Sequence, residues 1–400
     1  MSDSPGASPG RRQTQPHAGL PSTPQDRYTD LIATALPELH AWSGRPQPDD
    51  LAPLPGCPAV VLFVDGNGRP VQLLSTQQLK RLVISRLCRP VEQRRGRADL
   101  AEVVRGVRWR PVHCPFEGRL WYYRLARVLH AGEYRKLVAF KPAWFLHVDW
   151  RAAAPEIRVT DSVWCEGGAY LGPWPTRSAC QQSLDGLRDL FDLCRYPQQV
   201  RKAPRGTRCA YAEMGHCDAP CDGSVELAPY VQRCHAAWRF TTGGADEWVA
   251  EARQRMSRAA DEQAYELAGQ LKQQLRFAES WKARWATNVH PTGQLNYLLA
   301  LPVTRRRAWK LFLFRLGHLV DGPVVADRRV GPDSVAWLRE ELARATGTDP
   351  AVVRMEQTWL FCHLLFNRES AGVMRVHLPS LEVPVDLEQT VTEAVSSLRS

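Results

Sequence analysis

The sequence predicts an α+β fold made of a ββα unit, a cysteine-rich helical middle, an αα-hairpin and a C-terminal α+β piece. Three patterns support this. A strand–turn–strand–helix pattern covers 59–87, an almost unbroken helical stretch covers 247–281, and strands alternate with a helix after 295. A chain of 400 residues is long enough for two or three domains that each bury their own core.

The N-terminal segment is rich in Pro, Ser and Gly, and this composition predicts a disordered tail over 1–27. It contains no apolar core, so we do not expect a secretory signal. Apolar residues at helical spacing then predict a leading helix over 26–42, and a Pro-rich connector follows at 51–58.

The ββα unit is the clearest short-range pattern. Two apolar runs at 59–64 and 69–75 flank the turn sequence DGNG, whose Asp-Gly and Asn-Gly pairs favour a β-hairpin. The next segment, 76–87, places Leu79, Val83 and Leu87 on one side of an amphipathic helix.

The middle of the chain is less regular. Residues 119–129 fit either a strand or a helix, and 133–150 begin as a helix that must break near Pro142. A strand is expected at 156–161, and a helix over 176–194 would deliver Cys194 at its end.

The stretch from 247 to 281 carries an apolar stripe in its second half and bends near 259–261, which predicts an αα-hairpin. Beyond it, strands are expected at 296–302, 309–322 and 373–379, and a helix at 332–346. The stripe consists of Tyr265, Ala268, Leu271, Leu275 and Ala278.

Four cysteines lie close together in the sequence, spaced C-x14-C-x7-C-x3-C. Four thiolates complete either a tetrahedral zinc site or an iron–sulfur cluster. One tight pair with two distant ligands is at least as compatible with a cluster as with zinc, and buried packing is the third alternative. With no export signal we expect a reducing cytoplasm, where clustered cysteines bind metals more often than they form disulfides. The four are Cys194, Cys209, Cys217 and Cys221.

The formal net charge of +10 favours a polyanionic partner such as DNA. The basic residues are grouped at 93–97, 200–208 and 304–310. No run of eighteen apolar residues occurs, so no membrane partner is expected. The planar guanidinium suits phosphate contacts, and our candidates are Arg94, Arg95, Arg205 and Arg208.

Three elements in this order resemble the central part of the UvrC-type excinuclease subunit: the GPWP stretch at 172–175, the four cysteines, and the helical hairpin. The resemblance extends over about 55–285. It implies that the cysteines hold an iron–sulfur cluster, with 4Fe–4S preferred and zinc as the alternative. It also implies that the hairpin, called the UVR motif in this family, binds a UvrB-like helicase subunit. The implied partner-binding residues are Tyr265, Glu266, Ala268 and Leu271.

The ββα unit has the place and shape of this family's GIY-YIG nuclease domain, but the residues needed for cleavage are missing. That chemistry uses a Tyr, an Arg and a Lys, and a Glu that holds a divalent metal. Only Glu133 falls at such a position. The resemblance therefore implies a nuclease-inactive domain. The other catalytic positions correspond to Val61, Gln72, Leu74, Ser75 and Leu82.

We therefore expect a UvrC-like protein of nucleotide excision repair that binds DNA and a UvrB-like subunit. Two alternatives stay open: an active metal-dependent endonuclease of the GIY-YIG type that uses Glu133, and a zinc-stapled structural or regulatory module. The expected parts are a tail (1–27), a leading helix and linker (28–54), a degenerate GIY-YIG-like domain (55–150), an iron–sulfur middle domain (151–242), a UVR-like hairpin (243–285) and a C-terminal α+β region without an RNase H catalytic set (286–400).

Overall fold

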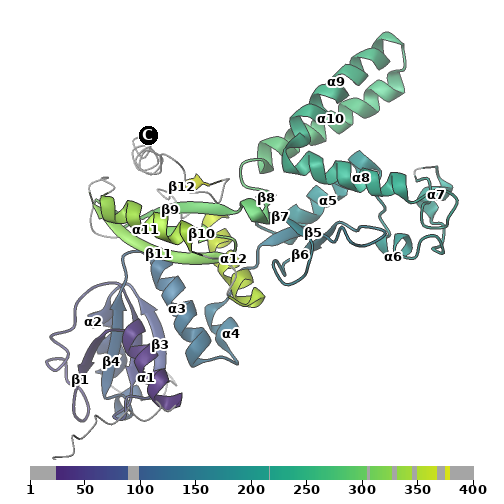
Figure 1. Ribbon diagram of the computed structural model, residues 1–400. Coiled ribbons are helices and arrows are strands. Elements are labelled where there is room, and N and C mark those ends of the chain that lie inside the picture. Colours follow the sequence, from purple (N-terminus) through teal and green to yellow (C-terminus); the bar gives the residue numbers. More distant parts are fainter. Residues whose placement is uncertain are drawn as a thin grey trace, which may run out of the picture. The chain divides into compact units, whose positions relative to one another are not determined.

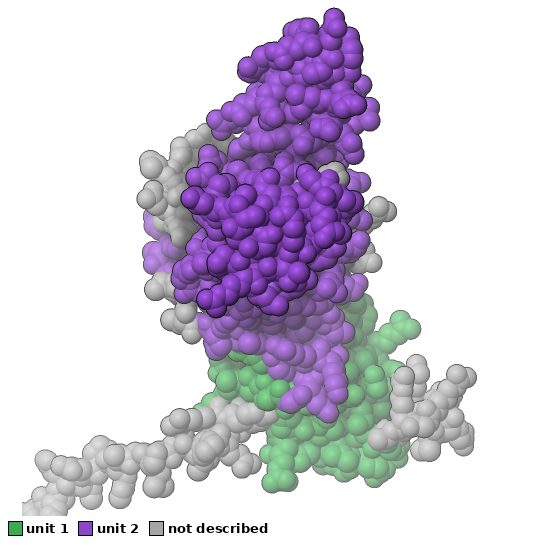
Figure 2. Space-filling view, turned by 90° about the vertical axis from the view of Figure 1, so that its right-hand side faces the viewer, with its two compact units in different colours: residues 1–131 green, residues 132–400 purple. Residues whose placement is uncertain are grey.

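A computed structural model describes residues 24–88, 99–215, 217–303, 307–326, 331–344, 349–366 and 374–378. The chain divides into two compact units, residues 1–131 and 132–400 (Figure 2). Most of the predicted N-terminal tail lies outside the described residues. The first helix already begins at Pro24, within the range assigned to that tail. No described helix combines the length and the apolar character needed to cross a bilayer.

The first unit is built on an antiparallel sheet with strand order β1-β4-β2-β3 (Figure 1). The predicted hairpin and the helix after it are confirmed as β2, β3 and α2. The predicted helix over 26–42 is wrong in its second half, because the helix ends at Ala35 and β1 pairs with β4. The elements are α1 (Pro24–Ala35), β1 (Glu38–Ala41), β2 (Ala59–Val64), β3 (Pro70–Thr76), α2 (Leu79–Leu87), the 3-10 helix η2 (Leu100–Glu102), β4 (Gly106–Pro111) and α3 (Pro115–Leu129).

Strand β2 is the centre of this unit, because all six of its residues are buried. Val61 and Phe63 pack in one core with Leu79 and Val83 of α2. The segment 119–129, which fitted either a strand or a helix, belongs to α3.

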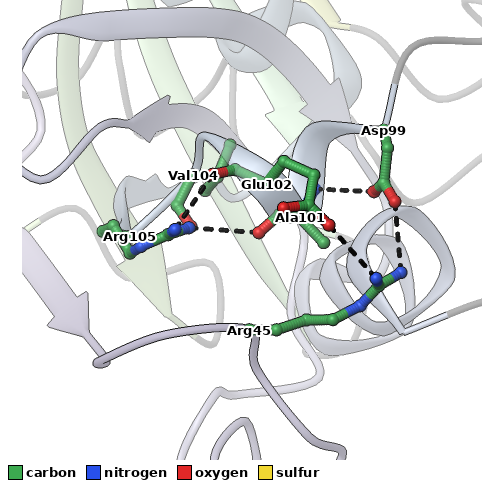
Figure 3. Close-up of polar contacts among 6 residues, drawn as sticks. All are labelled: Arg45, Asp99, Ala101, Glu102, Val104 and Arg105. Atoms are coloured by element: carbon green, nitrogen blue, oxygen red, sulfur yellow. Dashed lines mark hydrogen bonds and ion pairs between the residues drawn. The ribbon is translucent and has the colours of Figure 1, made fainter.

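A polar network fixes the loop between β1 and β2 to η2 (Figure 3). Arg45 reaches Asp99 at 3.2 Å and Glu102 at 3.3 Å, while Asp99 also accepts a hydrogen bond from the backbone N–H of Ala101. Arg105 donates to the carbonyl oxygens of Ala101, Glu102 and Val104. These contacts are largely solvent-exposed, so each stabilises the fold by less than about 1 kcal/mol.

The second unit contains two sheets. The first has strand order β6-β5-β7-β8 and is contacted by α5. The break predicted near Pro142 is confirmed, because α4 ends at Val138 and β5 starts at Trp144. The elements are α4 (Tyr134–Val138), β5 (Trp144–Val148), β6 (Arg158–Thr160), β7 (Ala169–Trp174), α5 (Arg177–Phe191) and β8 (His290–Pro291).

Helices α9 and α10 form the predicted hairpin and lie side by side (Figure 1). Arg253 bonds Glu279 and Lys282 bonds Asp246 across the pair. The helical elements between the sheets are α6 (Pro197–Val200), α7 (Ala210–Glu213), α8 (Ala228–Arg239), the π-helix η3 (Phe240–Gly244), α9 (Ala245–Asp261) and α10 (Tyr265–Trp285).

One hydrophobic core joins the cysteine-rich segment to the base of this hairpin. It contains Leu187 of α5, Cys221, and Leu275 and Trp281 of α10. Helices α5 and α10 approach closely where Gly186 meets Phe277, since a Cβ at Gly186 would collide with that ring. The expected boundary between a middle domain and a separate hairpin at 242/243 is therefore not a break in the core.

The second sheet has strand order β11-β10-β9-β12. The strand predicted over 309–322 is instead two strands, because Leu316 and Gly317 turn the chain with φ angles of 48° and 88°. Helix α12 was not predicted. The elements are the 3-10 helix η4 (Thr292–Gln294), β9 (Asn296–Pro302), β10 (Ala308–Arg315), β11 (His318–Ala326), α11 (Pro332–Ala343), α12 (Ala351–Phe366) and β12 (Met374–His377).

Helix α12 connects this C-terminal part to the start of the second unit. The side chain of Glu356 accepts hydrogen bonds from Arg135 at 2.7 Å and from Tyr134 at 2.8 Å. Trp164 donates its indole N–H to Thr358 at 3.0 Å. Helix α12 is therefore an integral part of the second unit.

Candidate metal centre

Three of the four clustered cysteines of the sequence line one pocket in the second unit, and the fourth lies beside it. This pocket has a volume of about 530 Å³ and is lined by Cys194, Cys209 and Cys217. Cys221 lies next to them, since its thiol interacts electrostatically with those of Cys209 and Cys217. The fold thus brings together cysteines that are up to 27 residues apart in the sequence.

The end of α5 places the first cysteine. Asp192 adopts the left-handed conformation with φ 49° and ends the helix, and Leu193 donates to the carbonyl oxygen of Arg188. The chain then turns, so that the backbone N–H of Tyr196 donates to the Cys194 sulfur at 3.4 Å. This N–H stabilises the negative charge of a thiolate, which is the form that binds metals.

The second cysteine is fixed by a helix start. Cys209 is the N-cap residue of α7, and its carbonyl oxygen accepts hydrogen bonds from the N–H groups of Ala212 and Glu213. Its side chain is half-buried at the pocket wall.

The last cysteine is held by a crossing of two backbone segments. Gly206 donates its N–H to the carbonyl oxygen of Cys221 at 2.8 Å. A Cβ at Gly206 would lie 2.5 Å from the carbonyl oxygen of Gln199, closer than real contacts, so glycine is required there. Ala219, with φ 56°, makes the preceding turn. The tight C-x3-C pair is thus shaped by a local turn and by contact with the segment before it.

Burial raises the pKa of the Cys194 thiol, and the three neighbouring thiols raise it further against the lowering effect of the Tyr196 N–H. Burial also raises the pKa of Cys221. Four thiolates in one place repel each other, and a thiophilic cation removes both the repulsion and the cost of burying charge. Thiolates are therefore the type of donor that zinc and iron–sulfur clusters require, whatever the spacing of the four sulfurs.

The four thiols lie near one another but do not converge on one point. Among the described residues, no group of three or more His, Cys, Asp or Glu side chains has the arrangement of a metal site. The pocket wall also holds a polar group without a partner. Arg233 of α8 lines the pocket, and its buried Nε–H has no acceptor within the described part of the chain. Sequence reasoning missed Arg233, which lies outside the C-x14-C-x7-C-x3-C segment.

Of the predicted DNA contacts, Arg94 and Arg95 lie outside the described residues. Arg205 and Arg208 are exposed beside the cysteine segment. Arg208 forms an ion pair with Asp222 at 3.2 Å, so binding a phosphate there would compete with that contact.

The predicted partner-binding residues divide along α10. Tyr265 is 71% exposed, and Glu266 is also exposed. Ala268 is half-buried, whereas Leu271 is only 2% exposed, in the hairpin. The accessible part of the predicted stripe is therefore the N-terminal end of α10, where Leu267 is exposed as well.

Of the positions that correspond to nuclease residues, Val61 is buried, Gln72, Leu74 and Leu82 are partly buried, and Ser75 is exposed. Val61 lies opposite Leu74 in the sheet, and both pack in the same core as Leu82. The side-chain oxygen of Gln72 is buried with no partner among the described residues. Glu133 is exposed at the start of α4 and belongs to the second unit, whereas the others belong to the first.

Comparison with known proteins gives a family match over part of the chain. The family model described as "UvrC/Cho excinuclease, middle domain" matches residues 143–240. This range begins just before β5, contains all four clustered cysteines and ends at the start of η3. No solved structure matches the chain.

Curated relatives agree with this match. "UvrABC system protein C" of Syntrophotalea carbinolica is 30% identical over 134 residues, which is 34% of this chain and 22% of that protein. The proteins of the same name from Levilactobacillus brevis and Moorella thermoacetica are 30% and 33% identical over 126 and 122 residues, each 20% of the relative. The matched part of this chain spans about a fifth of these relatives. About a third of the chain is thus similar to UvrC-type proteins.

Proposed function

We propose that this chain is a UvrC-like protein of nucleotide excision repair, in which Cys194, Cys209, Cys217 and Cys221 hold a metal centre. The observation that carries the proposal is the coincidence of two findings. The family match over 143–240 contains all four cysteines, and three of them line one pocket. An iron–sulfur cluster is the preferred group, and zinc is the alternative. Metal analysis of the purified chain tests the proposal and distinguishes the two.

The main role of this metal centre would be to stabilise the fold. When bound, the metal would cross-link the end of α5, the start of α7 and the turn before α8. The end of α5 and the turn before α8 share a core with the base of the hairpin. The centre would therefore fix the cysteine segment against α5 and α8, and through them the hairpin that presents Tyr265.

We further propose that the exposed end of the hairpin binds a UvrB-like subunit. Exposed aromatic residues are frequent energetic centres of interfaces, and Tyr265 is the most exposed large apolar side chain of the described residues. Tyr265→Ala is expected to weaken binding to UvrB about 10-fold or more, as measured by pull-down and titration.

Lys272→Ala is the matched control for this experiment, because Lys272 is also exposed on α10 but lies two turns away from Tyr265. It should bind like wild type. Leu271→Ala is not a contact test, because Leu271 is buried in the hairpin and its removal would act through folding. Failure of the wild-type chain to bind UvrB would remove this part of the proposal.

We also propose that the first unit does not cleave DNA. Val61, Leu74 and Leu82 supply no group that could stabilise a phosphate or activate water. Incubation with nicked or damaged duplex and Mg²⁺ or Mn²⁺ is expected to leave the DNA intact for both the wild-type chain and Glu133→Ala. Cleavage by wild type that is lost in Glu133→Ala would instead establish the active endonuclease.

A further inference from the structure

Arg233 carries a polar group that the protein fold leaves without a partner. Its side chain comes from α8 and lines the same pocket as Cys194, Cys209 and Cys217. Its Nε is shielded from solvent and has no acceptor among the described residues. A buried donor left without an acceptor costs about 1–3 kcal/mol, and more when it is charged, so it calls for an explanation.

The rest of the guanidinium is held in place. One terminal nitrogen forms an ion pair with Asp218 at 3.1 Å, and the group lies 5.9 Å from the ring centre of Tyr230. Asp218 directly follows Cys217 in the chain. The pair therefore connects α8 to the segment that carries a candidate ligand, and it fixes the guanidinium at the pocket wall.

The other two arginines of the pocket differ from Arg233. Arg188 pairs with Asp185 at 3.0 Å, and Arg195 pairs with Asp189. Arg195 also lies over the ring of Tyr211, 5.4 Å from its centre. Within the described part of the chain, neither carries a buried nitrogen that lacks a partner. Of the three arginines that line the pocket, only Arg233 has a buried nitrogen without an acceptor among the described residues.

We infer that Arg233 is a positioning residue of the metal centre and donates its Nε–H to a metal-bound sulfur, either a cysteine thiolate or an inorganic sulfide. This inference rests on the proposed function, because it requires a metal at the four cysteines. A metal-bound sulfur carries negative charge and accepts hydrogen bonds. Such bonds hold the ligands in place and raise the reduction potential of iron–sulfur clusters by stabilising the more negative reduced state.

The test uses the full-length chain, purified anaerobically with its metal, and follows metal loss to an excess of chelator. Arg233→Gln removes both the charge and the Nε–H, whereas Arg233→Lys keeps the charge and loses the planar donor fork. Both variants are expected to lose metal about 10-fold faster than wild type, in line with the effect of other groups that support metal ligands. If the metal is iron, both should also shift the reduction potential to more negative values.

Arg195→Gln is the matched control, because Arg195 lines the same pocket and its side chain is 31% exposed against 26% for Arg233. It removes a charge without removing a donor that lacks a partner, so its metal loss should stay close to wild type. Equal metal retention and equal potential in wild type, Arg233→Gln and Arg233→Lys would overturn the inference while leaving the metal centre intact. A wild-type chain without metal would overturn the inference and the metal centre together.

Discussion

Replacing Cys217 with serine is expected to remove the metal from the purified chain. A serine hydroxyl stays protonated at neutral pH and is a poor ligand for zinc or iron compared with a thiolate. The metal content per chain should fall to near zero. It is measured by elemental mass spectrometry after gel filtration.

Cys165→Ser is the control for this substitution. Cys165 is exposed in the loop before β7 and takes no part in the pocket. Its replacement should leave the metal content unchanged. If Cys217→Ser kept the full metal content of wild type, the assignment of this cysteine as a ligand would be wrong. If Cys165→Ser lost metal as well, the loss would reflect general instability.

The second large effect is expected at Arg135. Its partner Glu356 has a fully buried side chain on α12, and the two are joined at 2.7 Å. Arg135→Ala leaves a buried carboxylate without this charge partner. Breaking a fully buried ion pair in this way costs 3–5 kcal/mol, but Arg135 is 51% exposed and Tyr134 still donates to Glu356. We therefore expect a loss of about 2–3 kcal/mol in the free energy of unfolding, measured with urea.

Lys136→Ala, one residue further along α4, is the control, because Lys136 is exposed and should contribute little. Glu356→Gln in the Arg135→Ala background should recover part of the loss, since a neutral amide is less costly to bury than a carboxylate. A urea midpoint for Arg135→Ala equal to that of Lys136→Ala would show that this contact does not hold α12 to α4.

Local signals predicted much of the fold. The DGNG turn defined the β2–β3 hairpin because Asp-Gly and Asn-Gly favour the required backbone angles. The stripe that includes Leu271 and Leu275 predicted α10, and the bend near 260 predicted the hairpin. Each of these features depends on residues that are close in the sequence.

The errors arose where tertiary contacts decide the structure. Residues 38–41 continue a helical pattern but pair with β4. The turn between β10 and β11 uses Leu316 in a left-handed conformation, for which leucine gives no signal. Most of helix α12 is buried on more than one side, so its sequence lacks the periodicity that identifies a surface helix.

The candidate site was predictable in part. The spacing of the four cysteines predicted a metal site, and the fold places three of them at one pocket. The contribution of Arg233 was not predictable, because its pairing with Asp218 depends on how α8 packs against the cysteine segment. For the same reason, the burial of Leu271 followed from the contact between α9 and α10 rather than from its place in the stripe.

The most direct test of the metal centre is the iron and acid-labile sulfide content of the wild-type chain, purified anaerobically. We predict about four iron and about four sulfide per chain, as in a [4Fe–4S] cluster held by four cysteines, with a brown colour and broad visible absorbance. A colourless chain with one zinc would show that the four cysteines bind zinc and not an iron–sulfur cluster. A chain with neither iron nor zinc would contradict the proposal that these four cysteines bind a metal.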